Sequence, residues 1–215
     1  MTRPRILMAD DHSLMLAGLR RLVEEEGDVV GTVGDGRALV EEAQKLRPDI
    51  ILLDISMPLL NGLDAARQLT KLVPETKLIF LSMHATPTYV TEAFKAGAAG
   101  YLVKQSATSE LKQAIQAVLS GQHYMTPSVT KDMMEATPHP SVSPVCKRPV
   151  TALTPRQREV LQLIAEGKGT RSIASMLNIS IKTVEFHRTR LMEELDLHSV
   201  AELTRYAVSE GLVSL

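Results

Sequence analysis

The chain of 215 residues contains no tryptophan, and phenylalanine and tyrosine together make up 3% of it. Hydrophobic residues nevertheless account for 44% of the sequence, which excludes general disorder. We therefore expect cores built from leucine, valine, isoleucine, alanine and methionine. The length suits two domains of about 100 residues each, and a domain of that size can bury such a core.

Cysteine is nearly absent as well. Cys146 is the single cysteine, so an internal disulfide is excluded, which fits a reducing cytosol. No apolar run approaches the length of about 18 residues that a membrane-spanning helix needs, and no signal-peptide pattern opens the sequence. We expect a soluble, cytoplasmic protein with no membrane partner.

The chain also lacks an excess of charge of either sign, because its formal net charge is −1. This balance excludes the strongly basic footprint of a protein that binds nucleic acid through its overall charge. Any nucleic-acid binding must therefore depend on local charge and on dimerisation.

Four short apolar runs in the first half of the chain each end at a residue that can handle a phosphoryl group. Residues 6–9 precede Asp10 and Asp11, residues 50–53 precede Asp54, residues 78–81 precede Ser82, and residues 101–103 precede Lys104. Runs of this length are typical of parallel strands buried on both faces. A further strand near residues 29–33 has no such residue at its end, which suits an edge position.

Amphipathic stretches separate these runs, and we predict helices at residues 12–26, 36–46, 63–72, 88–96 and 109–119. The alternation predicts an α/β domain with a doubly wound, five-stranded parallel sheet. Ligands of such sheets bind outside the carboxyl ends of the strands. We therefore expect the five polar side chains to share one pocket.

That set of side chains is what a carboxylate nucleophile needs to accept a phosphoryl group with the help of a divalent metal ion. Mg²⁺ prefers octahedral oxygen coordination and usually keeps several waters. We predict direct metal ligation by Asp11 and Asp54, ligation by Asp10 directly or through water, and ligation by the backbone carbonyl of Ser56. The ammonium of Lys104 and the hydroxyl of Ser82 would bind phosphoryl oxygens.

Each of these residues has an ordinary structural explanation when it is taken alone. Asp10 and Asp11 could cap the next helix, Asp54 could belong to a turn, and a strand-end lysine is usually solvated. Their order at the ends of successive strands favours a functional pocket. A phosphatase of the haloacid dehalogenase class is the main competing interpretation, but it needs a second aspartate where this chain has Ser56.

Residues 1–121 resemble a bacterial two-component receiver domain over its whole length. The acidic pair, the phosphorylated aspartate, the hydroxyl residue and the lysine of that family match Asp10, Asp11, Asp54, Ser82 and Lys104. The loop at residues 57–62, with Pro58 and Gly62, matches as well.

This resemblance implies that a cognate sensor histidine kinase donates a phosphoryl group to Asp54, with Mg²⁺ as the cofactor. It also implies that Tyr101 is the aromatic residue that moves inward when Ser82 is drawn towards the phosphate. His84 would tune the lifetime of the phosphate. The protein would not be an enzyme, apart from catalysing its own phosphorylation and dephosphorylation.

The composition changes between residues 137 and 150, where prolines, serines and the pair Lys147 and Arg148 predict a semi-rigid linker. We place a first domain at residues 1–121, a linker at 122–150 and a second domain at 151–215. The second domain shows the start signals of four short helices. These signals are Thr154 with Gln157, Thr170, Ser180, and Ser199 with Glu202.

Residues 170–195 predict a helix, a turn at Asn178 and a second helix. In the second helix, the spacing predicts a core-facing side made of Val184, His187, Leu191 and Leu195. The outer side then carries Lys182, Glu185, Phe186 and Thr189, flanked by Arg188 and Arg190. An exposed Phe186 is unfavourable in water, and a thymine methyl in the major groove would cover it. A helical bundle with a protein-binding face is the alternative that periodicity alone favours.

Residues 153–215 resemble the LuxR-type helix-turn-helix output domain, and residues 153–161, 173–174 and 182–187 carry the match. The chain departs from the family pattern at Glu193-Glu194 and at residues 170–172. Together with the receiver, this output domain is typical of a NarL/FixJ-type response regulator.

The combined resemblance implies a phosphorylation-activated transcriptional regulator that binds double-stranded promoter DNA as a homodimer when phosphorylated, with RNA polymerase as a further candidate partner. The implied DNA-binding residues are Lys182, Thr183, Glu185, Phe186, Arg188, Thr189 and Arg190. The implied dimer contacts, on the last helix, are Val200, Leu203, Ala207 and Val208.

Overall fold

The computed structural model describes residues 3–83, 85–135 and 150–213. The chain divides into two compact units, the first formed by residues 1–57 and 61–139 and the second by residues 58–60 and 140–215. His84, Cys146 and the proline-rich part of the predicted linker at residues 136–149 lie outside the described residues.

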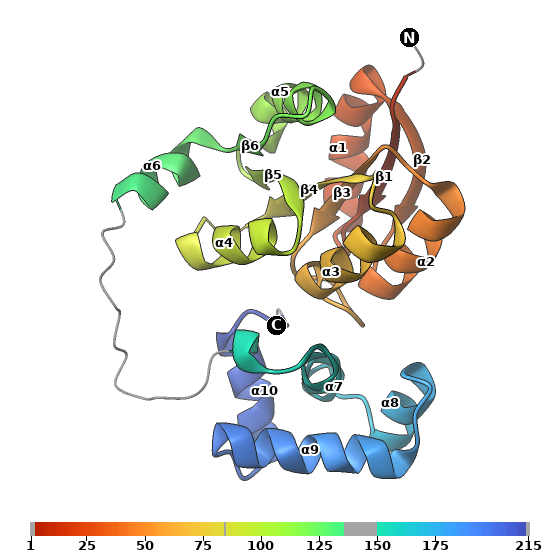
Figure 1. Cartoon of the computed structure of the whole chain (residues 1–215), viewed down its shortest axis with the longest axis vertical. Coiled ribbons are helices and arrows are strands. Elements are labelled where there is room, and N and C mark those ends of the chain that lie inside the picture. The colour runs from red at the N-terminus through yellow and green to blue at the C-terminus, as the bar shows by residue number, and fades with distance from the viewer. Residues whose placement is uncertain (1–2, 84, 136–149, 214–215) are drawn as a thin grey trace. The chain divides into compact units, whose positions relative to one another are not determined.

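The first unit is built on a parallel β-sheet (Figure 1). Its strands are β1 (Arg5–Ala9), β2 (Asp28–Val33), β3 (Ile50–Asp54), β4 (Lys77–Ser82), β5 (Ala98–Val103) and β6 (Tyr124–Met125). Across the sheet they follow the order β2-β1-β3-β4-β5-β6, so β2 occupies the predicted edge. The chain order reverses between β1 and β3, and such a reversal opens a crevice at the carboxyl ends of the two strands.

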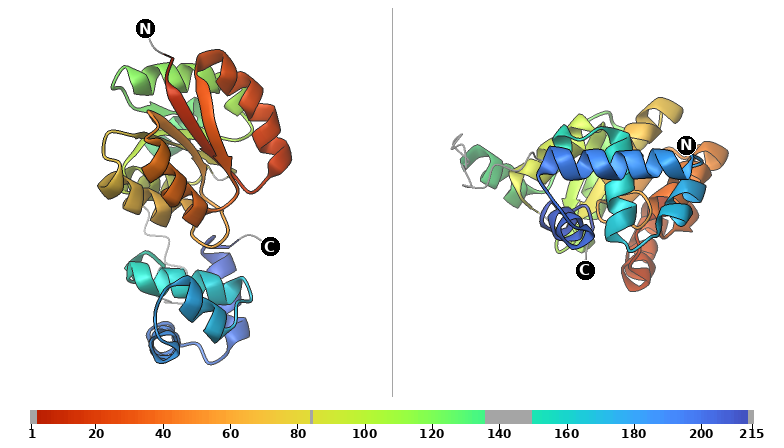
Figure 2. Two further views of the ribbon diagram at one scale, coloured as in Figure 1. Left: turned by 90° about the vertical axis from the view of Figure 1, so that its right-hand side faces the viewer. Right: turned by 90° about the horizontal axis from the view of Figure 1, so that it is seen from below.

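Helices cover both faces of this sheet (Figure 2). They are α1 (Ser13–Glu26), α2 (Gly36–Leu46), α3 (Gly62–Leu72), α4 (Pro87–Lys95) and α5 (Ala107–Leu119). Helices α1 and α5 pack together on one face, whereas α2, α3 and α4 pack in succession on the other. Alternate residues of the central strands face α1 and α5, for example Ile6 and Met8 of β1, which are fully buried with Leu111 of α5. The predicted doubly wound α/β fold is confirmed.

The described part of the first unit has six strands where the sequence predicted five. Tyr124 and Met125 of β6 pair in parallel with Gly100 and Tyr101 of β5. Helix α6 (Pro127–Glu135) follows, and its Val129 is fully buried. Residues 122–135, which the sequence predicted as the start of a linker, are therefore folded onto the first unit because an edge strand and an apolar anchor hold them there.

The second unit is helical. After a single turn η1 (Val150–Ala152), it contains α7 (Pro155–Ala165), α8 (Thr170–Met176), α9 (Ile181–Leu195) and α10 (Val200–Ser209). Helix α7 packs against α8, α9 and α10, around a core of leucine, isoleucine and valine. The predicted helical domain is confirmed.

The predicted caps explain where most of these helices begin. Thr154 and Gln157 form a reciprocal capping box at α7, and the hydroxyls of Ser180 and Ser199 accept backbone N–H groups at α9 and α10. Thr170 is an exception: it is the first residue of α8, and Gly169 occupies the cap without a side-chain hydrogen bond. Asn178 has a left-handed φ of 51°, as its predicted turn requires.

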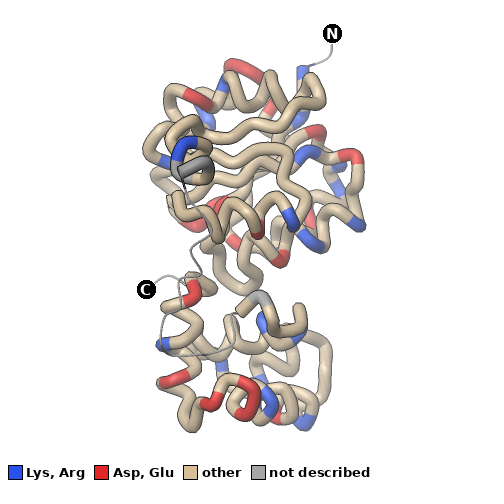
Figure 3. The backbone as a smooth tube through the Cα atoms, turned by 60° about the vertical axis from the view of Figure 1, so that its left-hand side comes forward, with Lys and Arg blue, Asp and Glu red and all other residues tan. Residues whose placement is uncertain are grey.

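Basic and acidic residues are interspersed along both units (Figure 3), in keeping with the balanced net charge. Within the described ranges, no helix combines the length and the apolar character needed to cross a membrane.

Candidate functional site

The carboxyl ends of β1, β3 and β5 bring three charged side chains together. The ammonium Nζ of Lys104 lies 2.7 Å from Oδ2 of Asp54 and 2.7 Å from Oδ2 of Asp10. Asp10, Asp54 and Lys104 are 1%, 4% and 5% exposed. Residues that are far apart in sequence thus form one buried ion-pair network at the predicted edge of the sheet.

Backbone N–H groups hold the other oxygens of the two aspartates. The amide of Ile55 donates to Oδ1 of Asp54 at 2.7 Å, and the amide of His12 donates to Oδ1 of Asp10 at 2.9 Å. These bonds fix the orientation of both carboxylates, so that their remaining oxygens face Lys104.

The acidic cluster also includes the more exposed Asp11. One ligand atom from each of Asp10, Asp11, His12 and Asp54 lies within 4.8 Å of the others. The three clustered carboxylates supply the oxygen ligands that Mg²⁺ prefers. The donor set therefore fits a divalent cation. Ser56, whose backbone carbonyl was predicted as a further ligand, is half-buried in the loop after β3.

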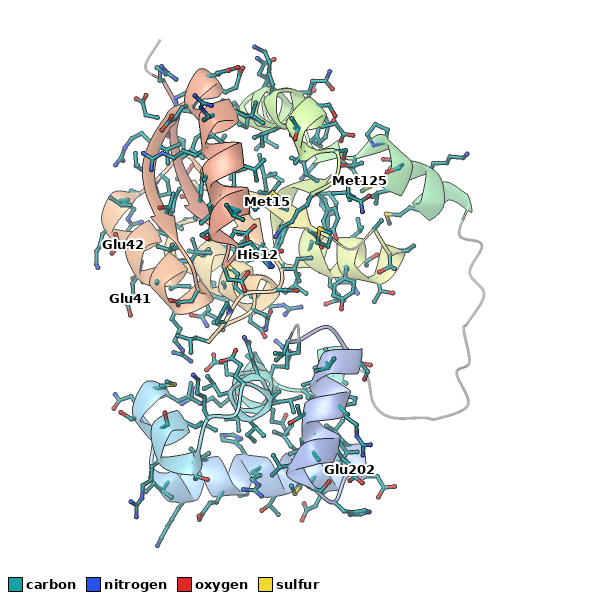
Figure 4. All side chains as sticks on the ribbon, turned by 180° about the vertical axis from the view of Figure 1, so that it is seen from behind. His12, Met15, Glu41, Glu42, Met125 and Glu202 are labelled. Atoms are coloured by element: carbon teal, nitrogen blue, oxygen red, sulfur yellow. The ribbon has the colours of Figure 1, made fainter. Side chains whose placement is uncertain are left out.

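His12 is a member of this cluster that the sequence prediction missed. It occupies the N-cap position of α1 (Figure 4), and its Nδ1 lies 2.8 Å from Oδ1 of Asp11 and 3.2 Å from Oδ1 of Asp10. Its position directly after the acidic pair was the available signal, but the direction of its ring depends on how α1 begins.

Burial and charge act in opposite directions on the central pair. Burial raises the pKa of the Asp54 carboxyl above its ordinary value, and the hydrogen bond and charge of Lys104 only partly oppose this rise. Burial lowers the pKa of the Lys104 ammonium, but its bonds to Asp10 and Asp54 outweigh that effect and the net pKa is raised. Burial thus makes the charged form of Asp54 costly, whereas the two neighbouring carboxylates favour the charged form of Lys104.

Ser82 ends β4, and Tyr101 lies on the neighbouring β5, two residues before the end of that strand. Both are fully buried, and a hydrogen bond joins the Ser82 hydroxyl to the Tyr101 side chain. Burial raises the pKa of the Tyr101 phenol to about 12. The backbone amide of Lys104 donates to the Ser82 carbonyl at 2.8 Å, so the hydroxyl residue and the lysine are coupled through the sheet.

Gly62 lets the loop after β3 pass close to Asp54. Its amide donates to the Ile55 carbonyl at 2.7 Å, and a Cβ at this position would lie 2.0 Å from the backbone oxygen of Asp54. No side chain fits such an approach. Asn61 then caps α3 by accepting the amide of Asp64 at 2.9 Å, which fixes the far end of the loop.

In the second unit, α9 presents an outer face of the predicted composition. Lys182, Glu185, Thr189 and Arg190 are exposed, and Phe186 is 60% exposed. Ile181, at the start of the helix, adds a second apolar side chain that is 43% exposed. A helix that exposes two large apolar side chains beside charged ones has the character of a binding surface.

The inner side of α9 agrees with the prediction at three of its four positions. Val184, Leu191 and Leu195 are buried, whereas His187 is half-buried. Burial and the nearby positive charge of Arg156 lower the pKa of His187.

Three of the predicted DNA-binding side chains are half-buried or lie close to a neighbouring side chain. Arg188 is half-buried, and Arg190 lies 4.0 Å from the carboxylates of both Glu193 and Glu194. Thr183 is half-buried, and its hydroxyl lies 2.8 Å from the Ser180 hydroxyl at the helix cap.

Helix α10 requires a correction. Leu203 and Ala207, predicted as dimer contacts, are fully buried in the core of the second unit, because this side of the helix packs against α7. Val200 is 39% exposed and Val208 is half-buried. Two of the four predicted residues thus remain on the surface, two turns apart on the same side of the helix.

Comparison with known protein families identifies a domain in each of the two units. The response regulator receiver domain matches residues 6–116, and the bacterial regulatory proteins of the luxR family match residues 151–207. Together they define a transcriptional response regulator, which is not a classical enzyme.

Individual relatives match nearly the full chain. The transcriptional regulatory protein MctR of Rhizobium johnstonii is 34% identical over 98% of this chain and 95% of its own length. The response regulator UvrY of Escherichia coli is 34% identical over 96% of this chain and 94% of its own length. The oxygen regulatory protein NreC of Staphylococcus epidermidis is 35% identical over 97% of this chain and 99% of its own length. The chain therefore belongs to the NarL/FixJ-type response regulators, with a receiver domain and a LuxR-type DNA-binding domain.

Solved structures of the response regulator RcsB are similar to this chain. The Salmonella typhimurium protein is 27% identical and has a TM-score of 0.60, with 97% of this chain and 100% of that chain covered. RcsB of Salmonella enterica serovar Typhimurium, bound to promoter DNA in the presence of the phosphomimetic BeF₃⁻, is 29% identical with a TM-score of 0.59. This second comparison covers 97% of this chain and 99% of that chain.

Proposed function

We propose that Asp54 accepts a phosphoryl group from a cognate sensor histidine kinase in the cytoplasm, and that the phosphorylated chain binds promoter DNA as a homodimer. The observation that carries this proposal is the position of Lys104 Nζ, 2.7 Å from the carboxylates of both Asp10 and Asp54. A buried lysine shared by two carboxylates is already in place to bind a phosphoryl oxygen at Asp54.

In the transfer, a carboxylate oxygen of Asp54 attacks the phosphorus of a phosphohistidine. The new P–O bond forms as the P–N bond breaks, and the histidine nitrogen leaves with a proton from solvent. Mg²⁺, held by Asp10, Asp11, Asp54 and the backbone carbonyl of Ser56, would neutralise the negative charge between nucleophile and phosphoryl group. Lys104 exchanges its bond to Asp54 for one to a phosphoryl oxygen, while Asp10 continues to hold it.

The change at Asp54 is proposed to reach the surface through Ser82 and Tyr101. The Ser82 hydroxyl can donate either towards Tyr101, as in this structure, or towards a phosphoryl oxygen. Because Tyr101 is fully buried, a change in its partner alters the packing between β5 and α4. This two-state packing would govern dimerisation.

DNA binding is assigned to α9, placed in the major groove. The exposed outer face of this helix, and the RcsB relatives solved with DNA, support the assignment. We assign phosphate contacts to Lys182, Arg188 and Arg190. Contacts within the major groove are assigned to Thr183, Glu185, Phe186 and Thr189. Dimer contacts are assigned to Val200 and Val208 of α10, and RNA polymerase is a further partner consistent with transcriptional regulation.

The test is labelling with acetyl phosphate and Mg²⁺. Wild-type protein should acquire one phosphoryl group, and Asp54→Asn should acquire none, because an amide is not a nucleophile for this transfer. Asp28→Asn, which removes an exposed carboxylate at the start of β2, is the matched control and should be labelled like wild type. Stoichiometric labelling of Asp54→Asn at another residue would falsify the assignment.

A further inference from the structure

Strand β6 joins the sheet immediately beside the residues that form the proposed switch. Tyr124 pairs with Gly100, and Met125 (labelled in Figure 4) pairs with Tyr101. The next residue, Thr126, is 2% exposed. The comparison with receiver domains ends at residue 116, before this segment begins.

Two hydrogen bonds from Thr126 hold the end of β5. Its backbone amide donates to the Tyr101 carbonyl at 3.0 Å, and its Oγ1 accepts the amide of Val103 at 3.1 Å. The next amide, that of Lys104, donates in the opposite direction to the Ser82 carbonyl. The backbone that leads to Lys104 is therefore held from both sides, by β4 on one and by a single threonine hydroxyl on the other.

The same threonine directly precedes α6 and caps its first turn. Its carbonyl accepts the amides of Val129 and Thr130 at 3.0 and 3.1 Å, and Val129 is fully buried. Helix α6 packs against α4, and the ring of His123 meets that of Phe94 of α4 edge-on, with centroids 5.8 Å apart. From α6 the chain continues to the DNA-binding domain. Helix α6 thus follows directly on a threonine that is hydrogen-bonded to β5, the strand that carries Tyr101 and leads into Lys104.

We infer that Thr126 is a positioning residue that sets Lys104 and Tyr101 for phosphoryl transfer and passes their change of state to α6. This inference rests on the proposed roles of Asp54, Lys104 and Tyr101. A shift of the β5 backbone alters the bond between Val103 and the Thr126 hydroxyl, since a hydrogen bond weakens steeply with distance and angle. Docking of β6 and α6 then differs between the two states of Asp54.

The full chain tests this with Thr126→Val, which keeps the shape of the side chain but removes the hydroxyl. Loss of a partner for a buried amide typically shifts an equilibrium by about tenfold. We therefore expect acetyl phosphate and Mg²⁺ to label Asp54 about tenfold more slowly in this variant. Thr126→Ser keeps the acceptor and should restore the rate to within about twofold of wild type. Thr130→Val, one turn further on, is the matched control. It removes the 3.4 Å bond from the Thr130 hydroxyl to the Thr126 carbonyl but leaves the acceptor of the Val103 amide in place, so it should behave as wild type.

Hydrogen–deuterium exchange supplies a readout that a purely structural role would not move. In the wild type, BeF₃⁻ with Mg²⁺ should change the exchange of the amides of Val103 and Thr126. In Thr126→Val these amides should exchange faster, and their response to BeF₃⁻ should be lost. Thr126→Ser should keep the response to BeF₃⁻. The loss of the response in Thr126→Val would then come from the missing hydroxyl and not from general unfolding.

The outcomes separate the two ideas. If the wild type is labelled at Asp54 but Thr126→Val matches it in labelling rate and in the response to BeF₃⁻, the inference is wrong and the proposed function stands. If β6 of the wild type does not respond to BeF₃⁻, the inference is also wrong. Failure of the wild type to be labelled at Asp54 at all would overturn the proposed function, and the inference with it.

Discussion

At the scale of single residues, one cation serves two buried carboxylates. Lys104 contacts Asp10 and Asp54 at 2.7 Å each, in a setting that is almost closed to solvent. Removal of one partner from a buried ion pair leaves uncompensated charge behind, and this is far more costly than loss of an exposed pair. Lys104 therefore stabilises the fold as well as serving the proposed transfer.

Lys104→Met should lower the free energy of unfolding of the first unit by about 3 kcal/mol in the presence of EDTA. Addition of Mg²⁺ should restore part of this loss, because a bound cation again balances Asp10 and Asp54. Urea denaturation measures both effects. Lys112→Met, which breaks a 2.7 Å pair between Glu26 and a lysine that is 67% exposed, is the control and should stay close to wild type. A Lys104→Met protein as stable as wild type would contradict the argument.

Two glycines should respond to alanine in opposite ways. Gly62→Ala places a Cβ 2.0 Å from the Asp54 carbonyl, so the loop must move, at a cost of about 1–3 kcal/mol. Gly18→Ala in α1 meets nothing within 4 Å and should stabilise the first unit by about 0.5–1 kcal/mol. Chemical denaturation gives both values, and equal stability of the two variants would show that the loop is not constrained as described.

At the scale of helices and strands, the predictable elements were those with strong local patterns. Strands β1, β3, β4 and β5 are buried on both faces, so they appear in the sequence as continuous apolar runs with a polar residue at the end. Strand β6 has two residues, too few for any periodicity. Its place depends on the hydroxyl of Thr126 and on the edge of β5, which exist only once the sheet has formed.

In α9 and α10, helical spacing predicted which residues share a side but not what each side contacts. The outer face of α9 was predictable because its buried residues recur at helical spacing and leave charged residues opposite. For α10, spacing indicated an apolar side but not its partner, and Leu203 and Ala207 pack within their own domain. His187 was placed in the core from spacing alone, yet it is half-buried because it lies at the border between the two faces.

The residues of α9 should divide into two classes of DNA contact. Lys182→Ala should weaken binding to all sequences alike and reduce the slope of log affinity against log salt by about one, because one phosphate contact is lost. Glu185→Ala and Phe186→Ala should instead relax discrimination at particular base pairs by about 1–3 kcal/mol. Binding assays on operator variants at several salt concentrations, with phosphorylated protein, measure both. Unchanged base preferences in both truncations would mean that α9 is not the reading helix.

At the scale of the whole molecule, the balanced charge implies modest affinity of a single DNA-binding domain. A net charge of −1 gives no general attraction to DNA, so tight binding requires two domains on two half-sites. In the proposed function, dimerisation is the quantity that phosphorylation controls.

Addition of BeF₃⁻ and Mg²⁺ should raise the dimer fraction and the affinity for a two-half-site operator together. Analytical ultracentrifugation and a gel-shift assay on the same samples measure these quantities. Equal dimer fractions and equal affinities with and without BeF₃⁻ would show that phosphorylation does not control dimerisation or DNA binding.

The α10 surface provides the matched variants for that experiment. Val208→Glu should weaken binding to two half-sites while circular dichroism shows an intact fold, because Val208 is only half-buried. Leu203→Glu should instead unfold the DNA-binding domain, since Leu203 is fully buried. Normal operator binding by folded Val208→Glu would place the dimer contact elsewhere.

The burial of Tyr101 against Ser82 has an optical consequence in a chain without tryptophan. The chain has four tyrosines, and Tyr89, Tyr101 and Tyr124 lie on α4, β5 and β6, whereas Tyr206 lies on α10. With no indole to dominate the signal, the intrinsic fluorescence comes from these phenols, and emission from a phenol depends on what it is hydrogen-bonded to. One of these phenols, that of Tyr101, lies on the path of the proposed signal from Asp54, so the native protein carries an unlabelled reporter on that path.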